Sequence, residues 1–114
     1  MLLPIGVVNL LPITAQGGVL ATPVKLPQGR NKTFQFRGQI SSGTGTAVLQ
    51  ALGSNIPNPK TLGDYCLIGS AVTLSLVATG TISGVVEDNA PYLYVSVSLT
   101  SISAGGQVEC WVAS

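Results

Sequence analysis

Charged side chains are scarce in this chain. Five Lys or Arg and four Asp or Glu stand among 114 residues, which is 8%, whereas an ordinary soluble domain carries roughly a quarter. Free monomers rely on interspersed surface charge for solubility, so we expect much of this surface to lie against other protein. The formal net charge of +1 is too small to favour nucleic acid or a membrane surface, and we expect neither as a partner.

Histidine is absent, which removes the commonest general base and the commonest metal ligand. No serine lies in a Gly-x-Ser-x-Gly elbow, and the adjacent Glu87 and Asp88 would point to opposite faces of a strand. We therefore expect no enzyme activity, no cofactor and no metal site. Cys66 and Cys110 have the character of small buried residues, although the sequence leaves a disulfide between them open.

The first 29 residues contain only one charge, Lys25, and four of the seven prolines. They are too short and too interrupted for a membrane span, and they lack the basic region of a signal peptide. Since proline favours extended and edge conformations, we predict that residues 1–29 form an extended apolar arm, docked on or swapped with a neighbour. The alternative is an edge strand folded back on the same subunit. The arm side chains predicted at an interface are Leu2, Leu3, Ile5, Val7, Leu10 and Leu11.

From residue 32 onward, apolar and polar residues alternate, and no apolar helical periodicity is evident. Short alternating runs are separated by turns rich in Gly, Ser and Pro. The pattern predicts an all-β domain over residues 30–114, an antiparallel β-sandwich or jelly roll of about seven or eight strands. In the most regular run we assign Leu93, Val95, Val97 and Leu99 to the core, and Tyr92 and Tyr94 to the opposite face.

Three large aromatic residues are predicted on faces that point away from the core: Tyr92, Tyr94 and Trp111. Outward Trp and Tyr side chains suit a protein interface, and we predict them there. Two alternatives stay open at this point. The same residues could line a sugar-binding surface, or they could belong to the interior of the second sheet.

Three segments resemble a group of small virion proteins of tailed bacteriophages. They are Gly43-Thr44-Gly45-Thr46-Ala47-Val48 running to Gly53-Ser54-Asn55, then Ala90-Pro91-Tyr92-Leu93-Tyr94-Val95, then Ile102-Ser103-Ala104-Gly105-Gly106 before a final strand. The likeness covers about 60% of the chain. It departs at Ile56-Pro57-Asn58-Pro59, where such sequences commonly have Asp-Gly and a Trp, so their loop geometry does not transfer.

The resemblance implies a small β-sandwich that decorates or cements the phage head through protein–protein contacts. Its expected partners are the major capsid protein or other virion proteins, with copies of itself as a homo-oligomer, and its expected location is the virion. Two other roles remain open: a neck or tail component, such as a connector or fibre module, and a carbohydrate-binding β-sandwich.

Overall fold

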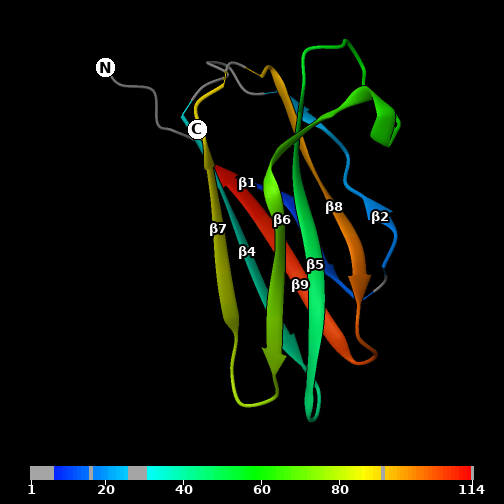
Figure 1. Cartoon of the computed structure of the whole chain (residues 1–114), viewed down its shortest axis with the longest axis vertical. Helices are drawn as coiled ribbons and strands as arrows, with labels where there is room; N and C mark the ends of the chain where they lie inside the picture. The colour runs from blue at the N-terminus through cyan, green and yellow to red at the C-terminus, as the bar shows by residue number, and fades with distance from the viewer. Residues whose placement is uncertain (1–6, 16, 26–30, 91, 114) are drawn as a thin grey trace.

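The computed structural model describes residues 7–15, 17–25, 31–90 and 92–113, with backbone only for 7–9 and 12–14. Two antiparallel sheets pack face to face (Figure 1). The first sheet has the order β1-β9-β4-β7, with bounds Val7–Thr14, Gly106–Ala113, Lys32–Ile40 and Ile82–Asp88. The second has the order β2-β8-β5-β6, with bounds Val19–Leu20, Tyr94–Ile102, Thr44–Ser54 and Cys66–Val77, and β3 (Val24–Lys25) also pairs with β8.

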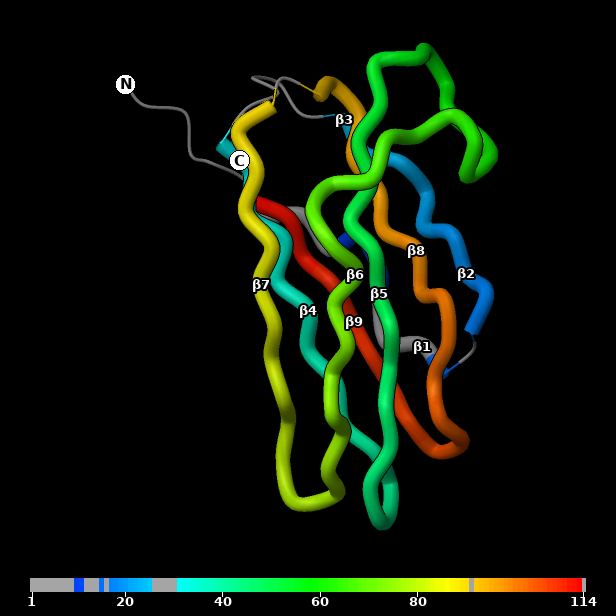
Figure 2. Tube along the Cα trace, in the orientation of Figure 1, coloured from blue at the N-terminus to red at the C-terminus, as the bar shows by residue number. Residues whose placement is uncertain are grey.

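Strand pairing is nested along the chain. β5 pairs with β6 and β4 with β7, while β2 and β3 both pair with β8, and β1 pairs with β9. Strands from the first half of the chain, up to β5, thus pair with strands from the second half, from β6 onward. Both halves contribute strands to both sheets (Figure 2). This is the double-sheet wiring of a jelly roll. The predicted all-β sandwich is confirmed, with β2 and β3 acting as one interrupted strand.

The core lies between the sheets and follows from the period-2 patterns. On β4, Phe34 and Phe36 are fully buried, while the residue after each of them, Gln35 and Arg37, faces solvent. Since burying a large apolar side chain is worth roughly 1.5–3 kcal/mol, these alternating rows fix which face of each strand points inward. Further buried members are Leu49, Leu74, Leu76, Val95, Val97, Leu99, Val108, Cys110 and Val112.

β6 is one continuous strand, although its pairing is interrupted near its middle. Its pairing with β5 shifts register between Leu49 and Ala51, where three residues of β6 oppose one of β5. Gly69 has a φ of 66° there, a backbone conformation that glycine adopts without steric cost. The side-chain amide of Gln50 donates to the carbonyls of Ile68 at 3.1 Å and Gly69 at 3.3 Å. The amide thus fills the bulge, and the strand continues to Val77.

The described part of the predicted arm lies on its own subunit. β1 is an edge strand paired with β9, and β2 and β3 pair with β8. This is the edge-strand alternative, because the apolar side chains find their burial within the same chain. Leu10 and Leu11 are both in the core. Neighbouring residues can both point inward here because the register shifts between Asn9 and Leu11.

The segment between β5 and β6 folds against the outer face of the second sheet. It contains the 3-10 turn η1 (Leu62–Asp64) and ends at Tyr65, which is buried together with Leu52 and Ser96. Burial raises the pKa of the Tyr65 hydroxyl, and Ser96 beside it acts in the opposite direction. The loop thus has a small buried cluster of its own, which is why an irregular segment keeps a defined position.

Candidate interaction surfaces

The outer face of the first sheet carries Trp111 together with an ion pair. In the antiparallel register of β4 and β9, Arg37 lies opposite Glu109 and diagonal to Trp111. The Nε of Arg37 donates to Oε1 of Glu109 at 2.7 Å, and Nη2 contacts the same oxygen. The guanidinium carbon lies 4.9 Å from the centroid of the Trp111 ring, in cation–π range. The cross-strand register brings Arg37 next to Glu109 and Trp111, which are far from it in the sequence.

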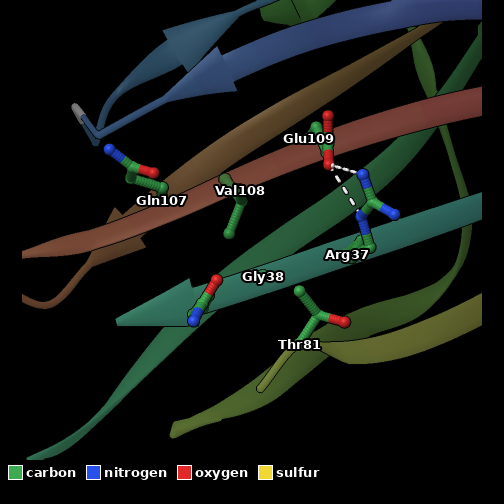
Figure 3. A pocket seen from close by; sticks show the side chains of 7 residues that line it. Arg37, Gly38, Thr81, Gln107, Val108 and Glu109 are labelled. Atoms are coloured by element: carbon green, nitrogen blue, oxygen red, sulfur yellow. Dashed lines mark hydrogen bonds and ion pairs between the residues drawn. The ribbon is translucent and has the colours of Figure 1, made fainter. Parts of the chain in front are cut away.

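A pocket of about 190 Å³ lies beside this ion pair. Figure 3 shows the Arg37–Glu109 pair on its rim, with Thr81 and Gln107 around the opening. The pocket offers a guanidinium, a carboxylate, a hydroxyl and side-chain amides within a small area. Such a group of donors and acceptors can bind a polar ligand or the polar rim of a protein partner.

Tyr92 lies on the inner side of the sandwich, contrary to its predicted outward position. It packs against the core, and a Cβ added at Gly53 would lie 2.5 Å from its Cγ. Its ring lies 5.6 Å from the Lys32 ammonium, which pairs with Asp88 at 3.2 Å. The neighbouring Cys66 thiol, together with burial, raises the pKa of its hydroxyl.

Leu93 is correspondingly exposed, although it was predicted in the core. β8 begins only at Tyr94, so the alternation of the strand does not extend back to residues 92 and 93. The backbone N–H of Leu93 donates instead to the Asn55 side chain at 2.8 Å. The two side chains have therefore exchanged faces relative to the sequence pattern.

The three aromatic residues singled out from the sequence do not form one surface. Tyr94 is half-buried on the outer face of the second sheet, where it lies opposite Ser54 and Lys25. Trp111 is half-buried on the outer face of the first sheet, and Tyr92 lies between the sheets at one end. A ligand surface that uses all three is excluded by this arrangement.

The predicted arm residues separate into two groups. Leu10 and Leu11 are 5% and 4% exposed, so they are unavailable to a partner and their prediction as interface residues is corrected. Val7 pairs with Ala113 through its backbone, and its side chain is not described. Leu2, Leu3 and Ile5 lie outside the described residues, so their assignment stays a prediction.

Four exposed apolar side chains that the sequence patterns did not reveal lie in segments at one end of the sandwich. Ile56, Leu62, Leu67 and Leu93 are 50%, 54%, 64% and 41% exposed, and we refer to them as the apolar end. They belong to the β5–β6 loop, to η1, to the start of β6 and to the residue that precedes β8, and these segments lie toward one end of the molecule (Figure 1). In the sequence, the signal available was a loop with two prolines, Pro57 and Pro59, that has the apolar residues Ile56 and Leu62 on either side of them.

Hydrogen bonds hold the apolar end in place. The Asp64 carboxylate accepts from the backbone N–H groups of Lys60 at 2.8 Å and Thr61 at 3.1 Å. These bonds lower the pKa of Asp64 from its ordinary value of 3.8, the bond from Lys60 most of all. The Ser54 hydroxyl donates to the Asp64 carbonyl at 2.7 Å. The exposed side chains are therefore presented on a fixed backbone.

The cysteines are not bonded to each other. Cys110 is buried in the core and Cys66 is exposed, and both thiols are free. Burial raises the pKa of Cys110 to about 12. Across the described ranges, no three His, Cys, Asp or Glu side chains lie close enough to hold a metal ion. Within the same part of the chain, no helical segment reaches the length and hydropathy of a membrane-spanning one.

Comparison by sequence finds no matching family model and no matching curated protein. Three solved structures are similar in fold. The K3 cleaved adhesin domain of Lys-gingipain from Porphyromonas gingivalis W83 has a TM-score of 0.54 at 13% identity, over 83% of this chain. The match spans only 62% of that adhesin chain.

The SPBc2 prophage-derived protein YomS has a TM-score of 0.53 at 14% identity, and the match covers 100% of this chain and 99% of YomS. A chain from the structure of infectious bursal disease virus Gx strain has a TM-score of 0.50 at 12% identity, over 96% of this chain and 32% of the viral one. At such identities the likeness is one of fold alone. The chain is a β-sandwich that shares its architecture with a prophage-derived protein and a viral protein.

Proposed function

We propose that this chain is a structural virion protein of the tailed-phage type, which decorates the head and stabilises it through protein–protein contacts without catalysis. The major capsid protein, or another virion protein, is its partner. The likeness to YomS supports this proposal because it spans both chains almost completely. The low content of charge supports it too, because a surface with few charges loses little hydration when a partner covers it.

The observation that carries the proposal is the apolar end. Four of the five large apolar side chains exposed in the described residues lie there. Burying each is worth roughly 1.5–3 kcal/mol, and the hydrogen bonds of Asp64 hold the backbone before binding, which lowers the ordering cost of association. Many copies on one particle would add avidity, since a copy that detaches locally is readily rebound.

The matched pair Leu62→Glu and Val85→Glu tests this surface. Val85 is 56% exposed on β7, in the first sheet, away from the apolar end. Particles that lack the protein are prepared from the phage genome that encodes it. Each purified variant is added to these particles, and the amount of variant that pellets with them is measured. We expect Leu62→Glu to weaken binding about tenfold or more, because a charge replaces a buried apolar contact, and Val85→Glu to bind like wild type. Equal binding of Leu62→Glu and wild type would contradict the proposal.

Carbohydrate binding is a second candidate, favoured by the surface around Trp111. A single Trp lies beside a polar pocket of about 190 Å³, and an aromatic ring next to fixed donors and acceptors suits sugars. It ranks second because the Arg37 guanidinium already lies over the Trp111 ring. Glycan titration of wild type and Trp111→Ala discriminates the two: binding lost in the variant supports this function, and no binding by wild type ends it.

A further inference from the structure

Two adjoining pockets lie where β4 ends and β9 begins. The first is the pocket of about 190 Å³ beside the Arg37–Glu109 ion pair. The second has a volume of about 270 Å³ and is lined by Gln39, Ile40, Ser41, Ala78, Gly105 and Gln107. The side chains of Gln39 and Gln107 belong to the lining of both pockets, so the pockets adjoin at this pair of glutamines.

The register of β4 and β9 arranges the polar side chains of the two pockets in a row. Gln39 lies directly opposite Gln107, and two residues earlier on β4 Arg37 lies opposite Glu109. Figure 3 shows Gln107 and the ion pair on these two strands. Ser41 follows directly after β4 and is exposed. Since residues two apart along a strand share a face, the ion pair, the glutamine pair and Ser41 follow one another along the outer face of the sheet.

These side chains offer a ligand both donors and acceptors. Gln39 and Gln107 are exposed, and each side-chain amide has two N–H donors and one carbonyl acceptor. The ion pair uses Nε and Nη2 of Arg37 and Oε1 of Glu109, so the pair itself leaves Nη1 and Oε2 available. Thr81 adds a hydroxyl group on the opposite wall of the first pocket.

This composition favours a neutral ligand that carries many hydroxyl groups. The cation and the anion that line the first pocket are paired with each other, so a charged ligand would meet no unmatched counter-charge there. Amide groups that donate and accept side by side are matched by hydroxyl groups, because one hydroxyl both donates and accepts. A peptide N–H or carbonyl has only one of these roles.

We infer that the two pockets bind a neutral oligosaccharide, which lies across the Gln39–Gln107 pair with adjoining sugar units in the two pockets. The inference rests on the second candidate function, carbohydrate binding, and is independent of docking to the head. It gives that function a site that does not require the Trp111 ring, over which the Arg37 guanidinium lies. Trp111 lines neither pocket.

Titration of the whole chain, followed by heteronuclear NMR, tests this site. The neutral probes are cellohexaose, maltohexaose and chitohexaose, and hexagalacturonic acid is the anionic control. We expect a neutral probe to shift the side-chain amide signals of Gln39 and Gln107 and to leave that of Gln35 in place. Gln35 is the matched control, because it is exposed on the same strand and lines neither pocket.

Variants then separate this site from the other proposals. The double variant Gln39→Ala/Gln107→Ala should bind the neutral probe about tenfold or more weakly, because it removes hydrogen bonds from both pockets, while Gln35→Ala binds like wild type. The double variant should still pellet with particles as wild type does, because head docking uses the apolar end.

The outcomes that contradict the inference are distinct from one another. Binding that is lost in Trp111→Ala and kept in the double variant would overturn this site and leave carbohydrate binding in place. The absence of a shift with every neutral probe would overturn both. Equal shifts with hexagalacturonic acid would overturn the assignment to a neutral sugar.

Discussion

Lys32 is a fully buried cation at the end of the sandwich where β4 begins. Its ammonium pairs with Asp88, contacts the carbonyl of Ala90 and lies over the Tyr92 ring. The relative exposure of the two paired side chains is unequal, 0% for Lys32 and 22% for Asp88. A buried charge that loses its partner is costly, whereas a partly exposed one can be hydrated. The two halves of this ion pair should therefore respond differently to substitution.

We expect Asp88→Ala to lower the free energy of unfolding by about 3 kcal/mol, because it leaves Lys32 buried without its counter-charge. Lys32→Met should cost less, because Met fills the space of the lysine stem and Asp88 gains water. Urea denaturation of both variants measures the difference. An equal or larger loss in Lys32→Met would show that the buried ammonium is not the sensitive partner.

Asp64 gives the loop of the apolar end a dependence on pH. Its folded pKa lies below the ordinary 3.8, so its stabilising effect is present above the unfolded value and is lost as pH falls through the folded pKa. We expect the amide protons of Lys60 and Thr61, followed by NMR, to shift with a midpoint below 3.8. In Asp64→Asn that titration should disappear. A midpoint at or above 3.8 would contradict the hydrogen-bonded loop.

At the scale of elements, β1 shows how an apolar N-terminal strand is used within its own subunit. Leu11 is 4% exposed and belongs to the core, whereas Leu62 on η1 is 54% exposed. We expect Leu11→Ala to cost about 2–5 kcal/mol of unfolding free energy and Leu62→Ala less than about 0.5 kcal/mol. Urea denaturation of the two variants checks this. Similar small losses would mean that β1 contributes little to the fold, as a detachable arm would.

The strands whose alternation is regular could be predicted from the sequence. On β8, Val95, Val97 and Leu99 are buried as predicted, and the alternation between buried residues and polar or half-exposed ones is equally regular on β4 and β9. The alternation fails near element ends. Tyr92 and Leu93 exchange faces because they precede β8, and Leu10 is buried beside Leu11 because a register shift interrupts the period.

The surfaces were less predictable than the core, because they depend on contacts between distant segments. Arg37 and Glu109 are 72 residues apart, and only the nested pairing of strands brings them together. The apolar end combines the β5–β6 loop with the start of β6 and the residue before β8 for the same reason. Nothing in the local sequence marks Leu67 and Leu93 as exposed, because each lies in a run of apolar residues. Which residues of such a run face the core depends on how the strands pair in the folded chain.

At the scale of the whole molecule, a jelly roll with few charges exposes four of its five large exposed apolar side chains, among the described residues, at the apolar end. Such a combination suits a component that is repeated over a large assembly. The central claim is that this assembly is a virion head.

The number of copies per purified particle, measured by quantitative mass spectrometry against the major capsid subunit, tests that claim most directly. The account predicts hundreds of copies of this chain on each particle, as expected for a protein that decorates the head lattice. About a dozen copies or fewer would place it in the neck or tail instead and contradict head decoration. Its absence from the particles would contradict a structural virion role altogether.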